Sequence, residues 1–267
     1  MAIADLHSHI LPGVDDGPAN LEGSFALARA AVAAGTRQIV ATPHFDHHQY
    51  ISPERVGPAV AVLNRALEAR GIPLVVRSGA EIALPRLFDL TDDQLALLTL
   101  GGGPYLLLES PFRRLAGEID TLVFSAQARG YRVLLAHPER SPGFHHDPDG
   151  LRRLAGTGVL MQVTASSITG DFGEKVRSFA LDMLRDGLVH VIASDAHDDA
   201  RRPPDVASWV RTAEAAVPGS AQRAAWMLEA VPAAILAGEE IPAPPPLPAR
   251  RGGEWRRRLA RAVSSRR

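Results

Sequence analysis

Residues 131–140 read YRVLLAHPER, a short apolar run that ends abruptly in histidine, glutamate and arginine. Apolar, β-branched runs of the same kind recur at 2–7, 36–43, 72–82, 104–111, 158–166 and 188–197. Segments with helical spacing lie between most of them, as at 25–34, 56–69, 119–128 and 176–184. Strands that alternate with helices in this way predict a parallel sheet with helical crossovers.

The number of units favours a closed sheet. Seven strand–helix units within about 240 residues suit a (β/α) barrel better than an open doubly wound sheet. No glycine-rich dinucleotide fingerprint follows the first run, which also argues against a Rossmann fold. The stretch 84–103 is expected to form an irregular or helical excursion. We therefore predict an α/β fold, a (β/α) barrel with seven strands.

Composition excludes several classes of protein. The chain has 267 residues and a net charge of −1, so the whole molecule has no electrostatic attraction for nucleic acid. It contains no cysteine, which excludes disulfides, thiolate metal sites and cysteine nucleophiles. No signal peptide and no apolar run of about 20 residues is visible, so we expect a cytoplasmic protein.

The chain divides into a domain at 1–240 and a terminal segment at 241–267. This segment begins with IPAPPPLPAR, a stiff proline-rich linker, and residues 250–267 carry eight arginines against one glutamate. Two interpretations of the basic tail stay open. It is either a disordered, solubilising terminus or a weak docking element for an anionic membrane surface or an acidic partner.

Imidazoles and carboxylates gather where the predicted strands end. The candidate set is His7, His9, Asp15 or Asp16, His44, Glu81, Glu109, His137, Asp195 and His197. The carboxyl ends of barrel strands converge on one mouth, where active sites form. His7 and His9, and likewise Asp195 and His197, are two residues apart, so each pair faces the same way on an extended chain.

Together these nine side chains predict a multi-metal site. Each residue alone has an ordinary interpretation as a solvated loop histidine or a strand-end carboxylate. Burying all nine without cations would leave charged and unpaired groups at a cost of several kcal/mol each. Nitrogen and oxygen ligands without sulfur suit Zn, Mn, Fe or Co, and nine side chains suit two or three ions.

Arginines near the same strand ends point to a phosphorylated substrate. Arg140 lies three residues after His137, and Arg201 and Arg202 follow His197. A guanidinium binds two phosphate oxygens at once and carries a permanent charge. The alternatives are an ion pair of Arg140 with Glu139 or another neighbouring acid, and an ordinary loop position for Arg202.

Several motifs resemble one known superfamily. The stretches DLHSHILPGVDDGP, IVATPHF, GAEI, LLLESP, LLAHPER, QVTASSITGDFG and VIASDAH resemble the PHP (polymerase and histidinol phosphatase) superfamily. Within it they are similar to the manganese-dependent protein tyrosine phosphatases of bacterial capsule and exopolysaccharide clusters. The resemblance covers residues 3–238 and excludes the basic tail.

The resemblance implies a distorted seven-stranded barrel of the PHP type with a trinuclear centre. It suggests one ion held by His7, His9, Glu81 and Asp195, a second by Glu81, Glu109 and His137, and a third by Asp16, His44 and His197. Asp16 is favoured over Asp15 because it directly precedes Gly17. Arg140 and Arg202 match positions that grip the phosphoryl group, and Mn is the implied metal.

The predicted activity is therefore metal-dependent hydrolysis of a phosphomonoester. The resemblance implies a phosphotyrosine protein as substrate, in particular a bacterial tyrosine kinase of polysaccharide synthesis. His44 is a candidate proton donor, although an imidazole that binds metal does not donate freely. Two rivals stay open: a small-molecule phosphoesterase such as a histidinol phosphatase, and a non-catalytic, metal-stabilised docking module. The sequence does not predict the oligomeric state.

Overall fold

A computed structural model describes residues 2–48, 51–110 and 118–246. The basic tail at 247–267 lies outside the described residues. The strands are β1 (Ile3–Ser8), β2 (Thr36–Ala41), β3 (His44–Phe45), β4 (Val75–Ser78), β5 (Glu81–Ala83), β6 (Tyr105–Glu109), β7 (Arg132–Ala136), β8 (Leu160–Thr164) and β9 (Val191–Ala193). All pairs between them are parallel, in the orders β1-β2-β4 and β3-β5-β6-β7-β8-β9.

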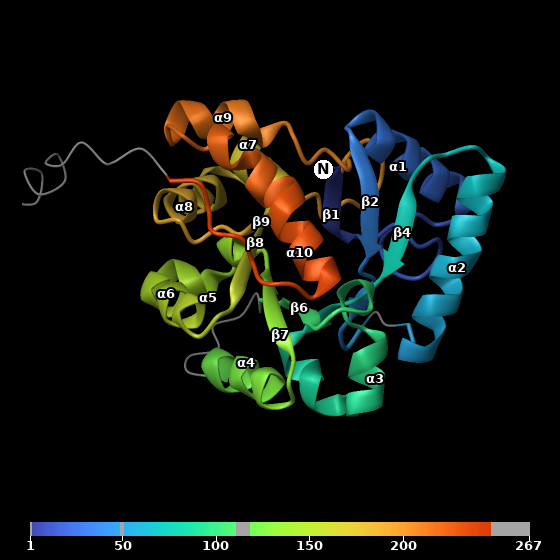
Figure 1. Ribbon diagram of the computed structural model, residues 1–267, viewed down its shortest axis with the longest axis horizontal. Helices are drawn as coiled ribbons and strands as arrows, with labels where there is room; N and C mark the ends of the chain where they lie inside the picture. The colour runs from blue at the N-terminus through green and yellow to red at the C-terminus, as the bar shows by residue number, and fades with distance from the viewer. Residues whose placement is uncertain (1, 49–50, 111–117, 247–267) are drawn as a thin grey trace, which may run out of the picture.

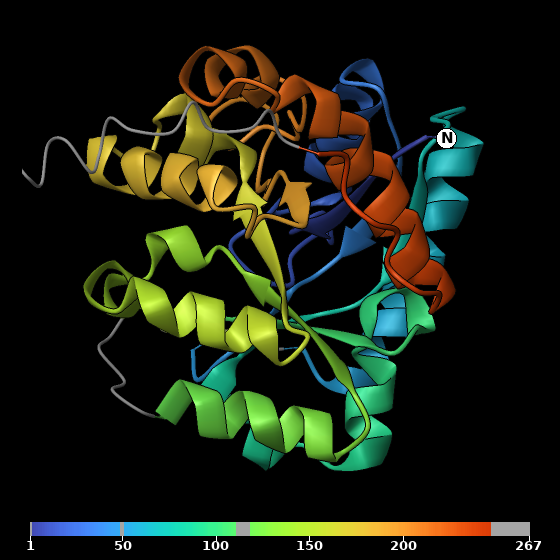
Figure 2. The same cartoon turned by 60° about the vertical axis from the view of Figure 1, so that its left-hand side comes forward.

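Helices cover the outer side of the strands (Figures 1 and 2). They are α1 (Leu21–Ala33), α2 (Pro53–Ala69), α3 (Asp92–Leu97), α4 (Glu118–Ala128), α5 (Pro142–His146), α6 (Pro148–Gly156), α7 (Ala165–Thr169), α8 (Glu174–Arg185), α9 (Trp209–Ala216) and α10 (Val231–Ala237). Short 3₁₀ helices occupy Leu84–Asp89, Leu100–Gly102, Pro138–Arg140 and Ala221–Arg223, and a turn of π-helix occupies Trp226–Ala230. The prediction of an α/β fold with parallel strands is confirmed, as is that of helical structure within 84–103.

The strand count differs from the predicted seven. Every predicted run holds a strand, but β3 forms an extra strand just beyond 36–43, and the run 72–82 contains β4 and begins β5. Pro43 separates β2 from β3 because it has no N–H for the strand ladder. Gly79 separates β4 from β5 at a close approach, where a Cβ atom would lie 2.7 Å from Val40 Cγ1.

The end of β1 and the segment after β9 connect the two sheets. Ser8 and Ala196 form an isolated parallel bridge, so the end of β1 runs beside the segment after β9. The His9 N–H donates to the Ala196 carbonyl at 2.8 Å, and the Asp195 N–H donates to the His7 carbonyl at 2.9 Å. These bonds bring the end of β1 to the chain that follows the last strand.

The apolar side chains fall into two clusters. The larger contains central strand residues such as Leu107 and Leu134, and the smaller lies under α1 and α2 around Leu27 and Leu63. Burial of these helix faces explains why amphipathic segments fold onto the strands. None of the helices in the described part of the chain is long and apolar enough to cross a membrane.

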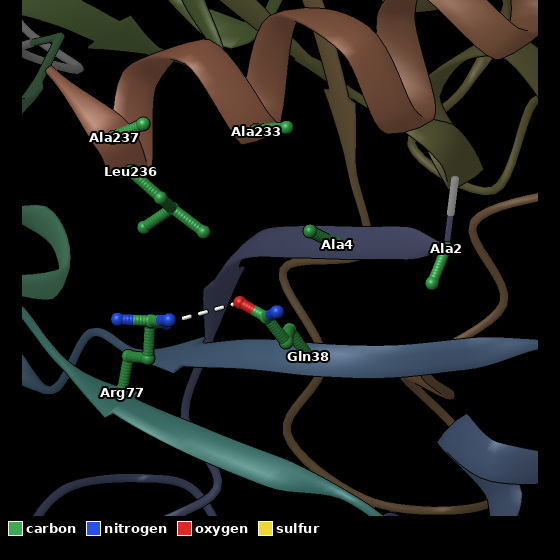
Figure 3. Close-up of a pocket in the computed structure, with 7 residues that line it drawn as sticks. All are labelled: Ala2, Ala4, Gln38, Arg77, Ala233, Leu236 and Ala237. Atoms are coloured by element: carbon green, nitrogen blue, oxygen red, sulfur yellow. Dashed lines mark hydrogen bonds between the residues drawn. The ribbon is translucent and has the colours of Figure 1, made fainter. Parts of the chain in front are cut away.

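A cavity of about 250 Å³ lies between α10 and the sheet β1-β2-β4 (Figure 3). Its lining is Ala2, Ala4, Gln38, Arg77, Ala233, Leu236 and Ala237. Arg77 Nε donates to Gln38 Oε1 at 3.0 Å, which pairs the polar groups in this lining. None of its residues belongs to the set of strand-end histidines and acids, so the cavity is separate from that set.

Candidate metal centre

The nine predicted side chains come together in the structure. Their ligand atoms form four overlapping groups, each with members within 4.8 Å of one another. The groups are His9, Asp16, His44 and His197; His7, His9 and Asp195; His7, Glu81 and His137; and His44, Glu81 and Glu109. Every one of the nine residues lies in at least one group. Seven different strands and loops carry them, so the fold brings together residues that are far apart in the sequence. That these residues bind ions stays a prediction.

Two imidazole nitrogens and two carboxylate oxygens form the middle of this arrangement. His7 Nε2 and His9 Nε2 are 3.3 Å apart. Each lies 3.4 Å from Asp195 Oδ1, and they lie 3.3 Å and 3.4 Å from Glu81 Oε2. Four lone-pair-bearing atoms thus point at one another in a buried space, which is the arrangement that a shared cation would stabilise.

The donor set fits divalent metal ions. Glu81 is buried, and its Oε2 accepts no hydrogen bond among the described residues, although His44 Nδ1 lies 3.0 Å away. A buried carboxylate oxygen without a hydrogen bond costs free energy unless a cation compensates it. The ligands are nitrogen and oxygen only, which suits Mn, Fe, Co or Zn rather than a thiophilic metal.

The structure separates the roles of the two neighbouring aspartates. The Asp15 carboxylate is buried, lies 2.7 Å from His9 Nδ1 and accepts from the backbone N–H groups of Gly17 and His44. The half-exposed Asp16 carboxylate instead lies 3.1 Å from His197 Nε2 and 3.5 Å from His44 Nε2. Asp15 therefore orients a histidine and its loop, while Asp16 faces the cluster.

Two of the nine residues have a strained backbone. In the described part of the chain, His137 (φ 30°) and Asp195 (φ 53°) are the non-glycine residues at positive φ. This conformation costs about 1–2 kcal/mol per residue and is found where the surroundings hold it in place. Such strain at two predicted ligands is typical of a functional site.

Buried hydrogen bonds hold the histidines and aspartates in position. His7 Nδ1 lies 3.0 Å from Gln162 Oε1, so the ring donates there and its Nε2 lone pair faces the cluster. The buried Asp5 carboxylate accepts from the Ser194 hydroxyl at 2.5 Å, from the Ser194 N–H and from the His7 N–H. Burial raises the pKa of Asp5 to about 6, against these hydrogen bonds.

Asp5 was missed by the sequence analysis. It stands two residues before His7 and four before His9, so the two-residue periodicity that pairs the histidines also includes Asp5. Gln162 lies near the end of the predicted strand run 158–166, which is a signal for a place beside the ligands, but the sequence does not show that its partner is His7, 155 residues away.

Arg140 and Arg202 converge on one carboxylate oxygen. Arg140 Nη1 and Arg202 Nη2 each donate to Asp195 Oδ2 at 2.6 Å, and Arg202 Nη1 lies 2.9 Å from His197 Nε2. Arg201 is exposed, and its backbone N–H donates to Asp198. Of the two neighbouring arginines, Arg202 is therefore the one beside the cluster.

The alternative ion pair of Arg140 is present, but it forms with Asp195 rather than with Glu139. Glu139 is buried, and its Oε1 accepts from the Thr164 N–H at 3.0 Å and from the Ser167 hydroxyl at 2.7 Å. These bonds tie the turn Pro138–Arg140 to the end of β8. Glu139 therefore anchors the turn that carries Arg140.

The carboxylates of the cluster have divergent pKa values. Burial opposes ionisation of Glu81, but the neighbouring imidazoles of His7, His137 and His44 outweigh it and hold the Glu81 pKa well below its usual range. Burial, followed by the negative charge of Glu81, raises the pKa of Glu109 to about 8. A nearby divalent cation favours the ionised carboxylate, so metal binding would reverse the shift at Glu109.

Comparisons with known proteins agree with this geometry. The family described as "Capsular polysaccharide synthesis, CpsB/CapC" matches residues 3–228. The tyrosine-protein phosphatase YwqE of Bacillus subtilis strain 168 is 38% identical over 198 residues, which cover 73% of this chain and 77% of that protein. The tyrosine-protein phosphatase CpsB of Streptococcus pneumoniae is 32% identical over 213 residues, covering 75% and 85% respectively.

Solved structures extend the likeness to the fold. A crystal structure from work on YwqE of B. subtilis and CpsB of S. pneumoniae, described as unique metal-dependent tyrosine phosphatases, aligns with a TM-score of 0.80 at 32% identity. The alignment covers 93% of this chain and all of that one. A β-aspartyl dipeptidase of Fervidobacterium islandicum aligns over 88% of this chain with a TM-score of 0.52 at 15% identity, which is a likeness of fold alone.

Proposed function

The chain belongs to the CpsB/CapC family of capsular polysaccharide synthesis, and from that premise we propose that it is a metal-dependent protein tyrosine phosphatase. The observation that carries the proposal is the gathering of nine histidine and carboxylate side chains beside two arginines. Cations would occupy the cluster, and the guanidinium groups would bind the phosphoryl oxygens. Both stabilise negative charge on the phosphoryl group of a phosphate ester that carries two negative charges.

We propose three ions, with Mn as the metal. His7, His9 and Asp195 would hold the first, with Glu81 shared between it and the second. The third would lie among Asp16, His44 and His197, and the structure adds His9 to that group. Glu81, Glu109 and His137 would hold the second ion; in the structure Glu109 and His137 fall into different groups, each with Glu81.

The chain's own residues supply binding, charge and orientation. Bound divalent ions supply Lewis acidity, which lowers the pKa of water and stabilises charge on phosphoryl oxygens. Arg140 and Arg202 would exchange part of their bonding to Asp195 Oδ2 for the substrate's non-bridging oxygens. The tyrosine leaving group has an ordinary pKa of about 10, so it requires less protonation than an alkoxide.

His44 is proposed as a ligand rather than as the proton donor. Its Nδ1 lies 3.0 Å from Glu81 Oε2 and its Nε2 lies 3.5 Å from Asp16 Oδ1, so both nitrogens face carboxylates of the cluster. An imidazole that binds a cation through one nitrogen and faces a carboxylate with the other has no proton available for the leaving group. The identity of the general acid stays a prediction to be tested.

We further propose that the two sheets form a distorted seven-stranded barrel of the PHP type. Counting β2 with β3 and β4 with β5 gives seven passages of the chain, and the Ser8–Ala196 bridge joins the first to the last. The domain would end near residue 240. Trp226 and Arg223 donate to the carbonyl groups of Pro242 and Pro245, which fastens the start of the terminal segment to this domain.

The proposed protein substrate is a bacterial tyrosine kinase of polysaccharide synthesis. The family name supports the link to polysaccharide synthesis, and the relatives' names support a phosphotyrosine substrate. The cytoplasmic location and the membrane contact of the tail stay predictions from the sequence.

Hydrolysis assays test the proposal. The full chain with added Mn²⁺ should hydrolyse p-nitrophenyl phosphate and a phosphotyrosine peptide, and EDTA or Arg140→Ala should abolish or strongly reduce both rates. Activity on histidinol phosphate that exceeds activity on the peptide would favour the small-molecule phosphoesterase. Inactivity with Mn, Fe, Co and Zn alike would favour the non-catalytic docking module.

A further inference from the structure

One aromatic ring beside the candidate metal centre has no place in the hydrophobic core. Phe172 is partly buried, and neither of the two apolar clusters of the described residues includes it. Its ring instead lies 4.4 Å from the centre of the Arg140 guanidinium. A large apolar side chain outside both clusters of the described residues calls for another explanation.

The turn between α7 and α8 presents this ring. Gly170 (φ 107°) and Gly173 (φ 90°) flank it at backbone angles that favour glycine, and the Gly173 N–H donates to the Gly170 carbonyl at 2.9 Å. Helix α7 directly follows β8, so the turn lies at the same end of the strands as the predicted ligands. The local backbone thus holds Phe172 at the mouth of the site.

A chain of contacts through Arg140 and Asp195 connects the Phe172 ring to the cluster. Arg140 Nη1 donates to Asp195 Oδ2 at 2.6 Å, and Asp195 Oδ1 lies 3.4 Å from His7 Nε2 and His9 Nε2. In an aryl phosphate, a single oxygen joins the phosphorus to the ring. When Arg140 binds the phosphoryl group, the aryl ring of the ester is therefore within reach of the aromatic neighbour of Arg140, Phe172.

We propose that Phe172 is a specificity residue that packs against the phenyl ring of the substrate and favours aryl over alkyl phosphates. This inference rests on the proposed phosphotyrosine phosphatase function. An edge-to-face or offset contact between two rings strengthens binding by about two- to tenfold beyond the burial of area. An alkyl phosphate offers no ring and gains nothing from this contact.

A structural role of Phe172 makes a different prediction. If the ring served only to hold Arg140 by a cation–π contact, its loss would weaken the binding of every phosphate-like group equally. Two ligands with the same headgroup separate the roles. Phenylphosphonate carries an aromatic ring, methylphosphonate does not, and neither is hydrolysed.

Calorimetric titration of the Mn²⁺-loaded full chain tests the proposal. In Phe172→Leu the Kd of phenylphosphonate should rise about two- to tenfold, while the Kd of methylphosphonate stays the same. Phe172→Tyr keeps the ring and should bind both as the wild type does. Phe124→Leu is the matched control, since Phe124 is an exposed phenylalanine on α4, and neither Kd should change.

The outcomes that overturn the inference are specific. Equal weakening of both phosphonates in Phe172→Leu would reduce Phe172 to a positioning residue, and an unchanged preference for phenylphosphonate would remove its role altogether. The proposed function fails separately, if the wild-type protein shows the preference for phenylphosphonate but hydrolyses no phosphotyrosine peptide with any of the four metals.

Discussion

Replacing Gln162 by leucine tests whether the hydrogen bonds behind the histidines set the affinity for metal. Gln162 is fully buried on β8, and its Oε1 lies 3.0 Å from His7 Nδ1. Leucine keeps a similar volume but accepts no hydrogen bond. The His7 ring then loses the partner that fixes which nitrogen faces the cluster.

The size of the effect follows from this single bond. A buried imidazole N–H without an acceptor costs about 1–3 kcal/mol. Part of that cost is offset, because Gln162 Nε2 is itself buried without a hydrogen bond among the described residues and disappears with the substitution. Loss of a hydrogen bond to a ligating histidine typically weakens metal binding by about 10- to 100-fold.

Competition with a chelator of known affinity measures the metal effect, and urea unfolding of the metal-free protein measures the stability effect. Gln162→Glu should keep or strengthen metal binding, because a carboxylate accepts the same hydrogen bond. Gln127→Leu, which removes a partly buried glutamine that donates to the Thr157 carbonyl away from the cluster, is the matched control and should leave Mn²⁺ binding unchanged. Mn²⁺ binding by Gln162→Leu equal to that of the wild type would refute the role of His7 as a ligand oriented by Gln162.

Three further predictions concern other parts of the fold. Gly17→Ala places a Cβ atom 2.0 Å from the His9 carbonyl oxygen, so the loop must move. We expect the free energy of unfolding in urea to fall by about 1–3 kcal/mol and metal binding to weaken; wild-type values of both would contradict the packing of this loop. Glu139→Ala removes the anchor of the turn that carries Arg140; steady-state kinetics should give a raised KM that Glu139→Gln partly restores, whereas equal kinetics in all three proteins would refute the anchoring. Burial lowers the pKa of His190 to about 4, so the unfolded state binds this proton before the folded state does as the pH falls below about 6.5. In the metal-free protein, this difference should lower the free energy of unfolding by at most about 3 kcal/mol between pH 6.5 and pH 4. His190→Gln should lose that part of the pH dependence, and identical pH profiles of the two proteins would exclude the pKa shift.

The strands and the candidate ligands could be predicted because both leave local signals. Apolar runs such as that before His137 end in polar residues within one or two positions, and the parallel order of strands brings such ends together. The choice of Asp16 over Asp15 needed the family resemblance at the level of sequence. In the structure the Asp15 carboxylate contacts His9 Nδ1, whereas the Asp16 carboxylate contacts His197, and this difference supports Asp16 as the candidate ligand.

Contacts between distant segments could not be predicted in this way. Asp5 meets Ser194 across 189 positions, and Gln162 meets His7 across 155. Neither pair leaves a periodic pattern, because the contact depends on which strands become neighbours and at which register. The break between β4 and β5 at Gly79 could not be predicted for a related reason, since only the packed structure places Val40 against Gly79.

Metal content, measured together with anomalous diffraction at the manganese absorption edge, tests the central claim most directly. The account predicts that the chain, purified from cells grown with Mn²⁺ or reconstituted with it, binds three ions per molecule. Their anomalous peaks should lie among the four groups around Glu81, Asp195 and the five histidines. A chain that takes up no divalent ion, or peaks that avoid these side chains, would contradict it.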